Sequence, residues 1–79
     1  MTKSNLMKAL AKHFEGLDIR DASDFHGRKS VGLWLPNASY DFGVRGMEEK
    51  GDNKLNDFIE SKGWFIEPYD AETMMCYPQ

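Results

Sequence analysis

Two short segments in the middle of the chain alternate in polarity, and this alternation limits the folds that the chain can adopt. Residues 31–35 read Val-Gly-Leu-Trp-Leu, and residues 40–44 read Tyr-Asp-Phe-Gly-Val. Because successive side chains of a β-strand point to opposite faces, each segment predicts a strand with one apolar face. Pro36-Asn37 predicts the turn between them. Such a hairpin exposes too much apolar surface to be stable alone, so other elements must cover it.

Two helical patterns can provide that cover. The first predicts a helix over about residues 5–15, with Ser4 as its N-cap, Gly16 at its end and apolar residues at helical spacing: Leu6, Met7, Leu10 and Phe14. The second predicts a helix that starts after Asp52 or Asn53, runs to about Lys62 and ends at Gly63. Its apolar stripe consists of Leu55, Phe58 and Ile59.

The remaining segments complete a small sheet. Residues 17–20 alternate apolar and charged side chains and predict a short strand, followed by a polar loop over residues 21–29. Residues 64–67 and 72–77 predict a last hairpin with its turn at residues 68–71. The expected fold is a single α+β domain over residues 1–79. It has two layers, an antiparallel sheet with two helices on one face, in the order α-β-β-β-α-β-β.

The order of elements over about residues 4–62 resembles that of a double-stranded-RNA-binding domain, or of a small toxin family with the same topology. The resemblance is one of element order and carries no sequence motif. It implies an RNA contact through a basic start to the second helix. Here that start is Asp52-Asn53-Lys54, preceded by Glu48-Glu49, which has the opposite charge.

Composition excludes several classes of protein. The longest uninterrupted apolar run is residues 64–66, so we expect no membrane span. Residues 1–8 contain two lysines among their few apolar residues and do not have the pattern of a signal peptide. A small secreted domain usually contains several disulfides, whereas Cys76 is the single cysteine of this chain. We therefore expect a cytoplasmic protein.

The sequence offers few groups for catalysis. His13, His26 and Cys76 cannot be paired into a nucleophile and base from their spacing. Asp18, Asp21, Asp24 and His26 crowd nine residues, which is a possible start for a hard-metal site. Their spacing fits no calcium loop, and a solvated acidic turn is the favoured interpretation. We expect no enzyme, no metal site and no cofactor.

Charge is distributed unevenly along the chain. Residues 1–16 hold three lysines and one glutamate, whereas residues 47–79 hold eight acidic residues and three lysines. The second half therefore carries a net charge of -5. An acidic surface repels phosphate and steers basic partners, although the same charge can also serve only to keep a small domain soluble.

The main functional hypothesis is a protein-binding module that acts as an inhibitor or adaptor of a larger protein. A phage or mobile-element accessory protein that acts on a host enzyme is one plausible setting. Trp34 is expected on the sheet face that the helices leave uncovered, and the turn around Tyr69 places an aromatic ring among carboxylates. The candidate partner-binding residues are Trp34, Glu48, Glu49, Glu67, Tyr69, Asp70 and Glu72. Residues 72–77 are further expected to leave an open strand edge, which could pair with a partner strand or form a homodimer.

Three alternatives remain open. A weak nucleic-acid site could combine the basic residues of the first helix and first β loop, namely Lys8, Lys12, Arg28 and Lys29, with Trp34. The acidic surface could instead imitate DNA, although 13 acidic against 10 basic residues is a small excess. A metal-dependent enzyme built on residues 18–26 is the third alternative.

Overall fold

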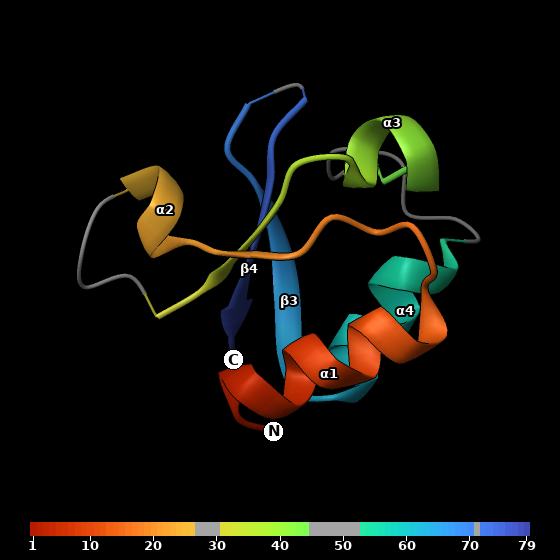
Figure 1. The fold of residues 1–79 in the computed structure, drawn as a ribbon, viewed down its shortest axis with the longest axis vertical. Coiled ribbons are helices and arrows are strands. Elements are labelled where there is room, and N and C mark those ends of the chain that lie inside the picture. The colour runs from red at the N-terminus through yellow and green to blue at the C-terminus, as the bar shows by residue number, and fades with distance from the viewer. Residues whose placement is uncertain (27–30, 45–52, 71) are drawn as a thin grey trace.

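The computed structural model describes residues 1–26, 31–44, 53–70 and 72–79 (Figure 1). The described residues form a four-stranded antiparallel sheet and four helices, which confirms the α+β class. In chain order the elements are α1 (Lys3–His13), β1 (Arg20–Asp21), α2 (Ser23–His26), β2 (Leu33–Leu35), α3 (Ala38–Phe42), α4 (Lys54–Ser61), β3 (Trp64–Pro68) and β4 (Met74–Pro78).

The sheet has the strand order β1-β2-β4-β3, and every neighbouring pair is antiparallel. Strand β4 thus lies inside the sheet, with Met75 opposite Trp34 of β2 on one side and opposite Glu67 of β3 on the other. The prediction of an open edge at residues 72–77 is therefore wrong. Within the described residues, β1 and β3 are the edge strands, and Pro68 at the end of β3 lacks the N–H that a further strand would need.

The core lies between one face of the sheet and helices α1 and α4, as the sequence predicted. Leu6 and Leu10 of α1 and Leu55 and Ile59 of α4 join Leu33, Leu35, Met74 and Cys76 of the sheet in one buried cluster. We call this face of the sheet the inner face and the opposite one the outer face. Each of these side chains is at most 2% exposed, so the two helices exclude water from the inner face.

Both long helices begin and end at residues suited to those positions. Thr2, rather than the predicted Ser4, caps α1, because its Oγ1 accepts a hydrogen bond from the Asn5 N–H at 3.2 Å. Asn53 caps α4 as predicted, with its Oδ1 accepting from the Asn56 N–H at 2.8 Å. Gly63 follows α4 at φ +83°, a left-handed conformation that favours glycine.

The predicted strand over residues 40–44 is wrong, because most of this segment forms helix α3. Ala38 and Phe42 are four residues apart, so both reach the core from one side of a helical turn. Gly43 then adopts φ +67° and its N–H bonds to the carbonyl of Ala38, which ends the helix. The alternation in this segment is compatible with both structures, and burial of Ala38 with Phe42 favours the helix.

The structure also corrects the region between α1 and β2. Of the strand predicted at residues 17–20, only Arg20 is in β1, and the predicted loop contains helix α2. The order of elements is therefore α-β-α-β-α-α-β-β instead of α-β-β-β-α-β-β. The order of elements on which the resemblance to a double-stranded-RNA-binding domain depended is not present.

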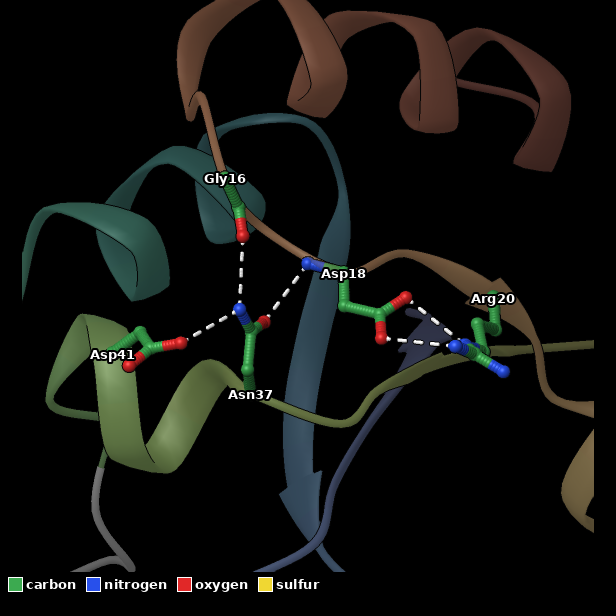
Figure 2. Close-up of polar contacts among 5 residues, drawn as sticks. All are labelled: Gly16, Asp18, Arg20, Asn37 and Asp41. Carbon is green, nitrogen blue, oxygen red and sulfur yellow. Dashed lines mark hydrogen bonds and ion pairs between the residues drawn. The ribbon is translucent and has the colours of Figure 1, made fainter.

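Asn37 ties the segment after α1 to the start of α3 (Figure 2). Its side-chain amide donates at 2.9 Å to the carbonyl of Gly16 and at 2.9 Å to the carboxylate of Asp41. Its Oδ1 accepts from the Asp18 N–H at 2.8 Å. Both amide hydrogens and the oxygen are thus used, and the segment that leads into β1 is fixed on the α3 side of the molecule.

Trp64 joins the two ends of the chain. Its indole N–H donates to the carbonyl of Met1 at 2.7 Å, and its own carbonyl accepts from the side chain of Gln79 at 3.1 Å. The Gln79 N–H also bonds to the carbonyl of Gly63 at 2.9 Å. The N- and C-termini consequently lie close together, at the end of the sheet away from the β3–β4 turn (Figure 1).

Candidate protein-binding face

The outer face of the sheet carries a row of four side chains, one from each strand. The strand register places Arg20 of β1 opposite Trp34, Trp34 opposite Met75, and Met75 opposite Glu67 of β3. Directly opposite residues of neighbouring strands have their side chains on the same face, so the four lie side by side. The row runs from a basic residue at one edge of the sheet to an acidic residue at the other.

Two further aromatic rings, those of Phe25 and Tyr69, join Trp34 of this row in a cluster. The ring of Phe25 in α2 is tilted against Trp34, with 5.1 Å between ring centroids. Phe25 also contacts Tyr69, edge to face, with 4.9 Å between ring centroids. Phe25 is 37% exposed and Tyr69 57% exposed, while Trp34 is half-buried beneath them. We call Phe25, Trp34 and Tyr69 the aromatic patch.

The patch stands on a packed base. Met75 lies on the outer face yet is only 1% exposed, so the centre of this face is covered. Further along β4, the ring of Tyr77 lies so close to Gly32 that a Cβ there would be 2.5 Å from it. A glycine covered by a cross-strand aromatic ring is a known way to fill the gap that the missing side chain leaves.

Arg20 is fixed at one side of the patch. Its guanidinium makes two hydrogen bonds to the Asp18 carboxylate, with Nε at 2.9 Å from Oδ1 and the second nitrogen at 3.2 Å from Oδ2 (Figure 2). The guanidinium carbon lies 5.6 Å from the centroid of the Trp34 ring. Hydrogen bonding to Asp18 raises the pKa of Arg20, so this arginine stays charged while it stacks on the indole.

Asp21 holds α2, and hence Phe25, in place. Its Oδ1 accepts from the Ser23 N–H at 2.9 Å, at the start of α2, and its Oδ2 lies 2.9 Å from Nζ of Lys3 in α1. The hydrogen bond from Ser23 and the ammonium of Lys3 lower the pKa of Asp21 to about 2. The Ala22 N–H also bonds to the carbonyl of Gly32 at 3.0 Å, which attaches α2 to the sheet.

The pKa of Asp21 predicts a pH dependence of stability. Because the folded-state pKa of about 2 lies below the ordinary value of 3.8, the ionised carboxylate stabilises the fold above about pH 4. This contribution is lost as pH falls from about 4 to about 2. In Asp21→Asn the side chain is neutral at every pH. Urea denaturation at a series of pH values should show the wild type more stable at pH 6, with the difference disappearing towards pH 2.

Lys3→Gln provides a control, since the backbone hydrogen bond from Ser23 is the largest cause of the lowered pKa. This variant should keep part of the pH dependence. A stability difference between wild type and Asp21→Asn that is the same at pH 6 and pH 2 would contradict the assignment.

The acidic residues of the last hairpin have different roles. Asp70 builds the turn, because its Oδ1 accepts from the N–H groups of Glu72 at 3.0 Å and Thr73 at 2.8 Å. These hydrogen bonds lower the pKa of Asp70. Glu72 accepts a hydrogen bond from Tyr40 of α3 and thereby raises the pKa of that phenol. Glu67 is exposed on the outer face beside Met75.

The structure brings together three of the residues that the sequence singled out for partner binding, whereas the side chains of Asp70 and Glu72 are engaged within the fold. Trp34, Glu67 and Tyr69 lie on the outer face, and Asp70 and Glu72 lie in the turn next to Tyr69. Glu48 and Glu49 lie outside the described residues. Sequence reasoning missed Phe25, because it assigned that residue to a polar loop. Capping of Ser23 by Asp21 is the signal for α2 that was available in the sequence.

The residues of the nucleic-acid alternative are not brought together. Lys8 and Lys12 are exposed on α1, which packs on the inner face, whereas Trp34 projects from the outer face. Arg28 and Lys29 lie outside the described residues. The part of the basic surface that the structure describes therefore has no aromatic contribution from Trp34.

Asp18, Asp21 and Cys76 are engaged within the fold. Asp18 pairs with Arg20 and Asp21 with Lys3, and no three His, Cys, Asp or Glu side chains within the described residues are placed to hold a metal ion. Cys76 is buried in the core, and burial raises the pKa of its thiol to about 12. Among the helices that the structure describes, none is both long and apolar enough to cross a membrane. Comparison of the chain with protein-family models, curated proteins and solved structures gave no match.

Proposed function

We propose that this protein is a non-enzymatic protein-binding module whose contact surface is the aromatic patch together with Glu67 and Glu72. The observation that supports the proposal most directly is the packing of Phe25 against both Trp34 and Tyr69 on the outer face. Two of these rings are more than one-third exposed, on the sheet face opposite to the buried core. Exposed clusters of large apolar residues with a polar rim mark interaction surfaces.

The composition of the surface fits a protein partner. Tyrosine and tryptophan are over-represented among the residues that dominate binding energy, and they act best where neighbouring contacts exclude water. Glu67 and Glu72 are both exposed, and exposed charges around an interface chiefly affect the rate of association. An acidic rim selects a partner with a basic surface. We propose an inhibitor or adaptor role in the cytoplasm, in which binding a larger protein through this surface is the whole activity.

The proposal is tested with the double variant Glu67→Lys/Glu72→Lys. Asp70 is left unchanged because its carboxylate builds the turn. The wild-type protein is immobilised, binding proteins are captured from nuclease-treated lysate of the native source, and association with a captured protein is then measured at several salt concentrations. We expect charge reversal to slow association about tenfold or more at low salt and to flatten its salt dependence.

Glu15→Lys/Glu60→Lys is the matched control, since it makes the same change in net charge at two exposed positions outside the patch and the hairpin turn. Its association rate should stay closer to that of the wild type. Equal effects of the two double variants would mean that only net charge matters and would contradict a specific surface. Capture of proteins only from a parallel lysate without nuclease treatment would favour the nucleic-acid alternative.

A further inference from the structure

We propose that the aromatic patch recognises an arginine side chain of its partner, held between the ring of Tyr69 and the carboxylate of Glu67. This inference rests on the proposed function and specifies the chemistry of the partner. The ligand is a basic, extended segment of another protein that presents arginine rather than lysine.

The protein already contains one example of this arrangement. At one side of the patch, Arg20 stacks on Trp34 at 5.6 Å while Asp18 holds its guanidinium with two hydrogen bonds. The ring supplies the electron-rich face, and the carboxylate fixes the orientation of the planar cation. Both contacts form on a partly exposed surface, where the Arg20 side chain is 53% exposed and the Asp18 side chain 38% exposed.

The opposite side of the patch has an exposed ring, that of Tyr69, and an exposed carboxylate, that of Glu67. Tyr69 is 57% exposed and is held by its edge-to-face contact with Phe25 and by the bond of its N–H to the Thr73 carbonyl at 2.8 Å. Glu67, two residues before Tyr69, lies on the outer face of β3, whereas the Glu72 carboxylate accepts a hydrogen bond from Tyr40 of α3. The charge of this side is therefore complementary to a cation. The guanidinium of an arginine of the partner would neutralise the Glu67 carboxylate, as Arg20 neutralises Asp18.

Arginine suits this surface better than lysine. Its planar guanidinium can stack on a ring and donate two parallel hydrogen bonds to a carboxylate at the same time. The lysine ammonium is a compact, strongly hydrated charge that cannot make this flat contact. A carboxylate alone would attract arginine and lysine equally. A preference for arginine is therefore the property that the Tyr69 ring predicts.

The test uses three synthetic peptides with the same glycine- and serine-rich sequence and two cationic positions, occupied by arginine, lysine or neutral citrulline. Each is titrated into isotope-labelled full-length protein and followed by backbone amide chemical shifts. We expect the arginine peptide to bind about threefold or more tighter than the lysine peptide, and citrulline to bind weakest. The shifted amides should include those of Phe25, Glu67 and Tyr69.

Two variants separate the ring from the charge. Tyr69→Phe keeps an aromatic face and should retain the preference for arginine, whereas Tyr69→Leu should reduce the two affinities to the same value. Equal binding of the arginine and lysine peptides to the wild type, no binding of either, or a preference that survives Tyr69→Leu would each overturn this inference. The proposed function is judged separately, by whether protein capture depends on Glu67 and Glu72.

Discussion

Met75→Asp is expected to destabilise the protein by about 3 kcal/mol or more, the usual cost of an unpaired charge in a buried position. A domain of this length has a total stability of about 4 to 12 kcal/mol, so the loss is about a quarter of that total or more. The outer face of a two-layer sheet ordinarily tolerates polar residues. Met75, however, is only 1% exposed. An aspartate side chain is too short to reach water from β4, which lies between β2 and β3. Circular dichroism and urea denaturation provide the measurement.

Two control variants show whether burial is the cause. Met75→Leu keeps the apolar volume and should cost less than about 1.5 kcal/mol. Val31→Asp introduces the same charge at a residue that is 62% exposed and should change stability by only about 0.5 kcal/mol. If Met75→Asp were as stable as Val31→Asp, the outer face would be open to solvent and the packed base of the aromatic patch would be refuted.

Gly32→Ala is the second substitution with a large expected effect. Replacing a glycine with alanine usually stabilises a chain by about 0.4 to 1 kcal/mol where the backbone permits it. At Gly32 the new Cβ would lie 2.5 Å from the carbonyl oxygen of Cys76 and 2.5 Å from the Tyr77 ring. The ring can move, but the carbonyl belongs to the central strand β4. We expect a loss of about 1 to 3 kcal/mol in urea denaturation, as for other overpacked sites.

Gly16→Ala and the double variant Gly32→Ala/Tyr77→Ala distinguish the causes. Gly16 has φ +90° and nothing within 4 Å of an added Cβ, so its replacement shows the conformational cost alone, about 1 kcal/mol. Removing the Tyr77 ring should not restore stability to the level of Tyr77→Ala if the carbonyl is the obstacle. Full restoration would assign the clash to the ring and contradict the stated cause.

The parts of the fold that the sequence predicted are those with a local signal. Helices α1 and α4 have apolar stripes and are followed within three residues by glycines, and the β3–β4 hairpin consists of two apolar segments around a polar turn. In residues 38–44 the local pattern fits a strand, and the helix is favoured only because Ala38 and Phe42 meet a core built by distant residues. Strand order likewise depends on contacts between segments far apart in sequence, so the position of β4 could not be predicted.

The candidate site was predicted in part for the same reason. Trp34 and Tyr69 stand out in the sequence as aromatic residues at exposed positions of the expected sheet and turn. Phe25 belongs to the site only because the short helix α2 brings it over Trp34. That placement depends on two contacts between separate segments, the ion pair of Asp21 with Lys3 and the bond from Ala22 to Gly32. A polar loop and a four-residue helix look alike in a single sequence.

The interior position of β4 has a consequence for how the chain folds. Strand β4 is the last of the four in the sequence, yet it lies between β2 and β3. The pair β1–β2 therefore cannot join β3 in one sheet until β4 is in place. Closing the long loop between β2 and β4 costs chain entropy before any contact repays it, and proteins dominated by such non-local pairing fold more slowly than helical bundles. During synthesis, helix α1 can pack on the complete sheet only after β4 has emerged from the ribosome.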